Sequence, residues 1–335
     1  MEIKKYFSIP AVSNSVIRYF QISPNYCWKR MNNEIIDEEK SYTYLGKQSH
    51  MYILESEEFE KNYTYLDFKT PTSKQQQTFC EDYIKYTKTE SALDIEDEKF
   101  LSHEASLVYA YQDNYTADKK SAESILKSAK ILFEINSEYI KYLSIKGDYR
   151  EVLSKSRQEL LTTITQAIRK HKKANALIFE DQVSSRTQTF NELPVYWDFP
   201  IVIEGTALKC KSLLDRLIVD HEKKVVTLVD LKTTSVIGSQ VSTLEERQYY
   251  RQLAFYMLAV KNIKEIPNDY KIEAYIVFVN TVDPFECKVY KLSDVEFQRQ
   301  IIIITNLLTE ISWHWFTNKW EYSRAYYEGD GTENL

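Results

Sequence analysis

The spacing of hydrophobic and polar residues predicts helices through most of the first half of the chain. Apolar residues recur at steps of three and four over Glu98–Phe179, as one face of a helix requires. Ser13–Arg30 offers a serine or asparagine cap, a short amphipathic stretch and a break at its proline. Gly46–Tyr63 shows helical spacing only loosely, and the polar residues of Thr70–Gln77 predict a loop.

After about Ser184 the pattern changes to short segments rich in valine, isoleucine, tyrosine and leucine, which are typical of strands. The predicted strands are Leu193–Trp197, Leu208–Val219, Val225–Lys232, Ile272–Asn280 and Glu286–Leu292, and the predicted helices are Leu244–Val260 and Val295–Trp315. Three strands, a helix, two strands and a helix in this order predict a mixed sheet flanked by helices. The chain is therefore expected to be α/β, with a largely helical N-terminal half.

Composition narrows the function classes. The 335 residues are enough for one large domain or two modest ones, and only 6 Gly and 7 Pro argue against long flexible linkers. The formal charge is −6, from 43 Lys and Arg against 49 Asp and Glu. A protein that only coats DNA is usually basic, so the charge disfavours that class. It leaves room for a nuclease that gathers carboxylates around metal ions.

The four cysteines, Cys27, Cys80, Cys210 and Cys287, are scattered and lack the paired spacing of a zinc site. Reduced thiols in a cytosolic protein are the simplest interpretation. The N-terminal residues lack an apolar run of signal-peptide length, and no stretch approaches the ~20 apolar residues needed to cross a bilayer. We therefore expect a cytoplasmic protein without a membrane partner.

The residues that suggest chemistry lie in Leu208–Thr234, where two predicted strands are joined by a turn around Asp220–Lys224. Asp215 is on the first strand, and Asp230 and Lys232 end the second. Because side chains alternate along a strand, Asp230 and Lys232 are expected on one face. Charges at the end of an apolar strand are costly unless they are paired or bind a metal. A solvated surface pair and a metal site are both open at this point.

At these residues the chain resembles the PD-(D/E)xK nuclease superfamily, in particular its RecB-like and RecE-type phage recombination exonuclease branch. The family pattern is a hydrophobic strand with Asp-Arg, a second strand with Asp-x-Lys-Thr, and a helix with Gln-x-x-x-Tyr. The matching residues are Asp215 and Arg216, then Asp230 to Thr233, then Gln252 and Tyr256. The glycine that usually precedes the first aspartate is replaced near Lys211 and Ser212.

Two N-terminal segments resemble the same branch. Ser13-Asn14-Ser15, followed by Ile22-Ser23-Pro24, is similar to its opening, and Gly46 to His50 is similar to its G-x-x-x-H segment. The resemblance implies that His50 joins the metal site, although a lone histidine beside apolar residues is more often structural. The stretch from about 73 to 184 matches no pattern that we can name.

The resemblance implies a restriction-endonuclease-like fold and a Mg²⁺ site, with Mn²⁺ as an alternative. His50, Asp215, Asp230 and the Leu231 carbonyl would be ligands, since hard cations prefer oxygen donors. Lys232 would orient or help deprotonate the attacking water and stabilise the developing negative charge. An additional family carboxylate would be Glu192 or Glu204, although a glutamate at either position is more often a solvated surface residue.

The remaining candidates each have a structural alternative. Gln252 and Tyr256 share a helix face at i and i+4, and either line the site and contact DNA or serve helix packing. Arg216 and Arg251 are predicted phosphate contacts. The basic run Arg169–Lys173 is usually a solvated face or a favourable charge at a helix end, with DNA contact as a further option.

The expected function is Mg²⁺-dependent exonucleolytic digestion of double-stranded DNA ends. We expect one nuclease domain over residues 1–335, in which a mostly helical segment, residues 1–185, delivers His50 to the sheet of residues 186–335. The resemblance further implies phage-type recombination in a bacterial host cytoplasm, a single-strand annealing partner and a homo-oligomer. The alternatives are a site-specific or structure-specific endonuclease, or a catalytically silent DNA-binding scaffold. An iron–sulfur nuclease is disfavoured because only Cys287 lies late in the chain.

Overall fold

The computed structural model describes residues 6–36, 41–88, 102–116, 120–145, 150–180, 186–203, 206–235 and 244–332. The chain divides into two compact units, one formed by Met1–Ser56 with Leu161–Leu335 and the other by Glu57–Leu160. The single nuclease domain expected from the sequence stays a prediction.

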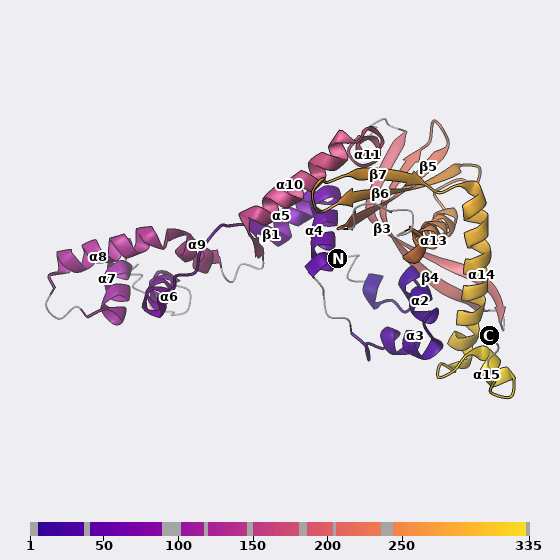
Figure 1. Ribbon diagram of the computed structural model, residues 1–335, viewed down its shortest axis with the longest axis horizontal. Coiled ribbons are helices and arrows are strands. Elements are labelled where there is room, and N and C mark those ends of the chain that lie inside the picture. Colours follow the sequence, from indigo (N-terminus) through magenta and orange to yellow (C-terminus); the bar gives the residue numbers. More distant parts are fainter. Residues whose placement is uncertain are drawn as a thin grey trace, which may run out of the picture. The chain divides into compact units, whose positions relative to one another are not determined.

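The first unit is built on a five-stranded mixed sheet (Figure 1). Its strands are β3 (Thr187–Ile203), β4 (Thr206–Asp220), β5 (Val225–Thr234), β6 (Lys271–Asn280) and β7 (Cys287–Lys291), in that spatial order. Neighbouring strands are antiparallel except β5 and β6, which are parallel. Parallel neighbours need a crossover, and the helix α13 (Tyr249–Lys261) supplies it. The predicted α/β fold with a mixed sheet and a helical N-terminal half is confirmed, and it is the restriction-endonuclease-like arrangement.

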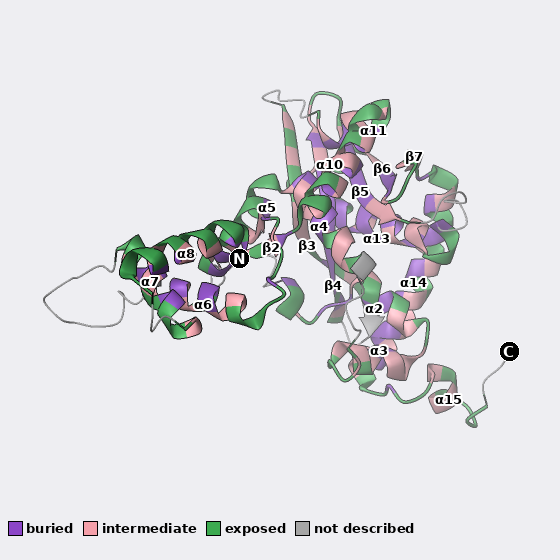
Figure 2. Ribbon diagram, turned by 60° about the vertical axis from the view of Figure 1, so that its left-hand side comes forward, coloured by how far each residue is buried: buried purple, intermediate pink, exposed green. Residues whose placement is uncertain are grey.

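The main core lies between one face of this sheet and the helices α13 and α14 (Asp294–Thr317). Figure 2 shows buried residues gathered in the central strands and in α13. In that core the rings of Trp197 and Phe255 lie 5.2 Å apart, joining β3 to α13. The even-numbered residues Leu228 of β5 and Ile276 of β6 point into it. Asp230 continues the same series, so its position in the strand directs it toward α13.

The odd-numbered residues of the two central strands, such as Leu231 and Val277, are buried on the other face. The helix α10 (Lys155–Lys170) begins in the second unit and ends in the first, where α11 (Lys172–Ile178) follows and packs against β7. The basic run Arg169–Lys173 spans the junction of these helices. Arg169 lies 3.8 Å from the ring of Phe179, and Lys173 Nζ lies 4.7 Å from that of Tyr275. These two charges are held over aromatic faces at the surface.

The N-terminal elements of the first unit are α2 (Asn14–Phe20), α3 (Pro24–Met31) and α4 (Ser41–Leu54). Ser13 and Ser23 cap α2 and α3, with their side chains accepting from backbone amides three residues on. This agrees with the cap and break expected within Ser13–Arg30. At the other end of the chain, the short helix α15 (Arg324–Glu328) follows α14.

The second unit contains the helices α6 (Lys74–Lys88), α7 (His103–Asn114), α8 (Ala122–Ile135) and α9 (Ser137–Ile145), with their own apolar core. The helix α5 (Ser56–Asn62) leads into β1 (Tyr63–Tyr65), which pairs in parallel with β2 (Glu151–Leu153). The sequence pattern did not predict β2, because its partner lies far earlier in the chain. The helix α6 begins within the predicted loop Thr70–Gln77. Within the described residues, no helix combines the length and apolarity that crossing a bilayer requires.

We expect Phe255→Ala to lower the free energy of unfolding of the first unit by about 3–5 kcal/mol, because truncating a buried phenylalanine removes contacts and leaves a cavity. Phe255 is fully buried in the main core. Urea unfolding followed by tryptophan fluorescence measures the change. Phe7→Ala is the matched control, since Phe7 is 70% exposed. Equal losses in the two variants would contradict this placement of the core.

Candidate active site

The candidate site lies where β4 and β5 part. The two strands pair from Asp220↔Val225 to Arg216↔Val229, and their pairing ends there. Asp215 and Asp230 are the next residue on each strand, so both aspartates stand at the fork. Beyond it, β4 pairs with β3, and β5 pairs with β6. At the closed end of the hairpin, Asp220 accepts from the backbone amides of Glu222 and Lys223 and closes the expected turn.

A fork frees backbone groups that a continuous sheet would pair, and buried groups of this kind need other partners. The Leu231 N–H donates to Asp215 Oδ2 at 2.8 Å. The Leu231 carbonyl lies 2.5 Å from His50 Nε2, so that nitrogen carries a proton and donates. Further along, β4 pairs with the residues that precede α2, residues 6–13, which we call the N-terminal segment. Val12 N–H donates to the Lys209 carbonyl, and Lys211 N–H donates to the Val12 carbonyl. Residues of the candidate site therefore complete the broken ladder.

The helix α4 brings His50 to the fork. Gly46 and His50 are four residues apart, so they share a face of the helix. A Cβ added at Gly46 would lie 3.3 Å from Thr233 Oγ1 on β5, tighter than an ordinary contact. The glycine thus permits α4 to lie close against β5, and the histidine one turn later reaches the Leu231 carbonyl. This gives the G-x-x-x-H spacing a physical reason.

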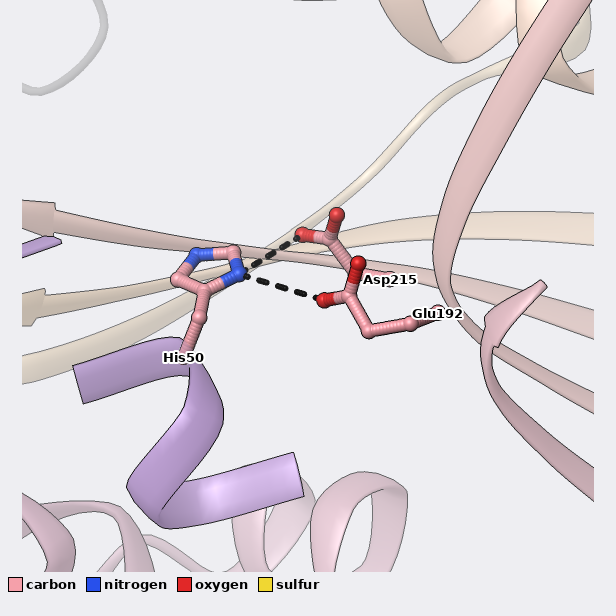
Figure 3. Close-up of side chains that lie close together, drawn as sticks. All are labelled: His50, Glu192 and Asp215. Carbon is pink, nitrogen blue, oxygen red and sulfur yellow. Dashed lines mark ion pairs between the residues drawn. The ribbon is translucent and has the colours of Figure 1, made fainter. Parts of the chain in front are cut away.

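Three potential metal ligands converge beside the fork, from α4, β3 and β4 (Figure 3). His50 Nδ1 lies 3.7 Å from Asp215 Oδ2 and 3.8 Å from Glu192 Oε1, and the three ligand atoms all fall within 4.8 Å of one another. Because His50 Nε2 is engaged by Leu231, Nδ1 is the nitrogen left to face the two carboxylates. Among the described residues, this is the one such group of three.

The strands bend at this position. In the first part of β4 the residues that point into the main core have even numbers: Leu208, Cys210 and Leu214. In the last part they have odd numbers: Leu217 and Val219. A regular pleat keeps one parity on each face, so the parity switch marks a bend between Leu214 and Leu217. Opposite this bend, Glu192 has a φ of 47°, in the left-handed region that non-glycine residues rarely adopt. Such conformations concentrate at functional sites.

Asp230 and Lys232 form a buried pair next to this cluster. Lys232 Nζ lies 2.7 Å from Asp230 Oδ2, and Gln252 Nε2 donates to Asp230 Oδ1 at 3.3 Å. The same Gln252 amide donates to the Tyr256 hydroxyl at 2.8 Å. The ring of Tyr249 lies 5.4 Å from Lys232 Nζ, a cation–π contact that the sequence did not indicate. The pair is therefore not a solvated surface pair.

Burial and neighbouring charges shift the protonation of these groups. Burial raises the pKa of Asp230 to about 6, and Asp215 adds to the rise while Lys232 opposes it. Burial disfavours the Lys232 ammonium, but the carboxylates of Asp230 and Asp215 outweigh burial and raise its pKa. Burial also disfavours a charged His50, yet Asp215 and Glu192 raise its pKa. The carboxylates thus create a strongly negative field that favours cations.

The residues present fit a hard divalent cation. Two carboxylates and one imidazole nitrogen converge within coordination reach of a common point, and the Leu231 carbonyl keeps a second lone pair beside them. Asp230 lies outside this group of three, with Lys232 Nζ 2.7 Å from one of its oxygens and Gln252 donating to the other. Its part as a ligand stays a prediction. Glu192 was one of two expected additional carboxylates, and the other, Glu204, lies outside the described residues.

The two arginines predicted to contact phosphate are buried and donate to protein acceptors. Arg216 Nε donates to the Leu177 carbonyl and its Nη1 to Asn191 Oδ1, both at 2.9 Å. Arg251 donates to Asn14 Oδ1 at 3.2 Å and also to Gln21 and Gln248. Burial, with Arg18 nearby, lowers the pKa of Arg251 to about 10. These contacts join the arginines to neighbouring parts of the fold, and their part as phosphate contacts stays a prediction.

A groove of about 630 Å³ adjoins the site on the side of α13. Gln252 and Tyr256 form its boundary with the site, and the N-terminal segment with α2 and α3 forms most of its wall. Arg30 and Lys211 are the cationic residues among its described lining, and none of that lining is acidic. Lys211 is buried and donates to the carbonyls of Tyr6 and Ile9, which holds the N-terminal segment in place.

Comparison with known families gives one match, in which a model described as the PD-(D/E)XK nuclease superfamily covers residues 101–319. This is more than half of the chain. A search of curated proteins gave no match.

Comparison with solved structures gives distant similarities. A structure titled "Crystal structure of SSO0001" has 13% identity and a TM-score of 0.27, covering 53% of this chain and 69% of that one. A protein from Eubacterium rectale titled "Putative exonuclease" has 15% identity and a TM-score of 0.33, covering 82% of this chain and 86% of that one. Similarities this weak carry no argument about activity.

We expect Asp215→Asn and Asp215→Ala to separate folding from metal binding. Both should bind Mn²⁺ more weakly, since a charged ligand is removed. The side-chain amide of Asp215→Asn can still accept from Leu231 N–H. Asp215→Ala leaves that N–H without an acceptor, which lowers the free energy of unfolding by about 1–3 kcal/mol. Urea unfolding and Mn²⁺ titration by electron paramagnetic resonance measure the two effects. Equal stability of both variants, or Mn²⁺ affinity like that of the unaltered chain, would contradict the assigned contact.

Proposed function

The chain belongs to the PD-(D/E)XK nuclease superfamily, and from that premise we propose that it hydrolyses DNA phosphodiester bonds with a divalent metal ion, acting as an exonuclease on duplex ends. The observation that carries the proposal is the convergence of His50, Glu192 and Asp215 beside the buried pair of Asp230 and Lys232. Ligands for a cation and a positive side chain are thereby assembled in one place.

The protein groups have distinct roles in this proposal. Asp215, Glu192, His50 and the Leu231 carbonyl would hold Mg²⁺, with Asp230 as the further predicted ligand and Mn²⁺ as the alternative ion. When bound, the ion supplies charge neutralisation for the phosphate and lowers the pKa of a water molecule.

Lys232 would act as an ammonium group. Its raised pKa keeps it protonated, which favours orienting the attacking water and stabilising negative charge over accepting a proton. Asp230 positions that ammonium at 2.7 Å, and Tyr249 covers it. Gln252 would orient Asp230, since its amide bridges the carboxylate and the Tyr256 hydroxyl.

The groove beside Gln252 and Tyr256 would receive a DNA strand. A polyanion is repelled by carboxylates, and the described lining of the groove contains none. Aromatic side chains line it, among them Tyr19 and the exposed Phe7. Stacking of bases on such rings is tolerant of sequence, as non-specific digestion requires. The groove thus supports a strand leading to the metal ligands.

The preference for ends rests on the resemblance of the N-terminal segments to the phage recombination branch. Ser13 to Ser15 line the groove, and His50 contacts the fork, so both segments contribute to the proposed site. The same resemblance extends the proposal to recombination with a single-strand annealing partner and to a homo-oligomer. An endonuclease of the superfamily and a catalytically silent DNA-binding scaffold are the competing functions.

The decisive experiment incubates linear duplex, labelled at either terminus in turn, and covalently closed duplex with the protein and Mg²⁺. We expect labelled mononucleotides or short products from one terminus and no cleavage of closed DNA. Lys232→Gln should cleave about 10²–10³-fold more slowly, because the amide can still donate to Asp230 but carries no charge. Cleavage of closed circles would favour the endonuclease, and binding without cleavage would favour the scaffold.

We expect Phe7→Ala to raise the KM for DNA at least about fivefold with little change in kcat, because base stacking contributes about 1–3 kcal/mol to binding and Phe7 is not among the proposed metal ligands. Initial rates over a range of duplex concentrations measure both constants. Phe190→Ala is the control, since Phe190 is a partly exposed phenylalanine outside the groove lining. A fall in kcat alone, or equal effects in the two variants, would argue against a strand in the groove.

A further inference from the structure

A second set of hydrogen bonds lies next to the three converging ligands and joins residues that are close to them in the sequence. Asn191 directly precedes Glu192, Arg216 directly follows Asp215, and Leu54 lies one helical turn after His50. Asn191 and Arg216 are opposite one another in the register of β3 and β4. The second set therefore involves the same three elements as the ligands themselves: α4, β3 and β4.

These neighbours are joined by side-chain hydrogen bonds. Arg216 Nη1 donates to Asn191 Oδ1 at 2.9 Å, and Asn191 Nδ2 donates to the Leu54 carbonyl at 2.7 Å. Leu54 is the last residue of α4, and carbonyls in the last turn of a helix lack partners within the helix. The Asn191 side chain thus donates to the end of α4, the helix that carries His50. It also accepts from Arg216, the residue next to Asp215.

The chain of contacts is anchored at its other end. Arg216 is 3% exposed, and its Nε donates to the Leu177 carbonyl of α11 at 2.9 Å. A planar guanidinium can donate in two fixed directions, which a lysine cannot reproduce. Asn191 itself is exposed, so it is a bridge at the surface and contributes little to the core.

The hydrogen bonds of Asn191 lie next to the strained backbone of Glu192. Glu192 has a φ of 47°, a conformation that costs on the order of 1–3 kcal/mol and persists only when its surroundings hold it. Asn191, one residue earlier, is tied to two other elements by hydrogen bonds. The contacts of Asn191 therefore constrain where the Glu192 carboxylate can lie relative to Asp215 and His50.

We infer that Asn191 and Arg216 are positioning residues that hold His50, Glu192 and Asp215 at the spacing needed to bind a divalent cation. The inference rests on the proposed metal-dependent function and goes beyond it, since Asn191 and Arg216 are assigned a role through their contacts with the elements that carry the ligands. Groups that orient ligands from behind commonly change metal affinity or activity by about 10–100-fold when removed.

The test measures Mn²⁺ binding directly by electron paramagnetic resonance, alongside DNA cleavage over a range of Mg²⁺ concentrations and thermal unfolding. Asn191→Ala should weaken Mn²⁺ binding at least about tenfold and shift the Mg²⁺ dependence of cleavage to higher concentration, with most of kcat recovered at saturating Mg²⁺. Arg216→Lys should do the same. In the double variant the loss should not exceed that of the weaker-binding single variant, because both residues act in one chain of contacts.

Asn262→Ala is the matched control. Asn262 also donates from an exposed side-chain amide to a helix carbonyl, that of Leu258 at 2.8 Å, but it bonds only within the end of α13. Its Mn²⁺ affinity should equal that of the unaltered chain, and its thermal stability should fall as much as that of Asn191→Ala.

The outcomes separate the two proposals. If the unaltered chain binds Mn²⁺ and cleaves DNA while Asn191→Ala binds Mn²⁺ like Asn262→Ala, the positioning role is overturned and the proposed function stands. Independent, additive losses in the double variant would also overturn a shared chain of contacts. If the unaltered chain binds no Mn²⁺, the metal-dependent function and the positioning role are overturned together.

Discussion

The parting of β4 from β5 leaves backbone groups that the surrounding elements of the first unit must satisfy. Sheets are stable because neighbouring strands satisfy one another's backbone groups, and a fork leaves such groups without their usual partners. Here the Asp215 carboxylate accepts the Leu231 amide, His50 donates to the Leu231 carbonyl, and Val12 pairs with the freed edge of β4. Two of these groups, Asp215 and His50, are also proposed metal ligands, so stability and function are coupled at the fork.

The same arrangement gathers like charges at an energetic cost. Asp215, Asp230 and Glu192 lie close together, and among the described residues the ammonium of Lys232 opposes their charge. Buried carboxylates repel one another and lose hydration, which is why the pKa of Asp230 is raised. A chain selected for stability alone would not keep this cluster, whereas a bound cation would relieve the repulsion. Local conflict within an otherwise consistent fold is expected at functional sites.

The N-terminal segment belongs to the site as much as the sheet does. It occupies the edge of β4 that β5 leaves, and the groove forms between this segment and α13. Lys211 and Arg251 hold it in place from β4 and α13, with their charged ends turned to protein acceptors. These two buried basic residues thereby organise the wall of the groove.

Periodicity is a local property of the chain, and it was enough to predict the α/β class, the five strands and the placement of Asp230 and Lys232 on one side of a strand. Periodicity could not place Glu192 beside His50 and Asp215, or predict β2. Nor could it show that Arg216 donates to Asn191. Those outcomes depend on strand register, on the bend opposite Glu192 and on how closely α4 approaches β5. They emerge only in the folded chain, because each requires contacts between residues far apart in the sequence.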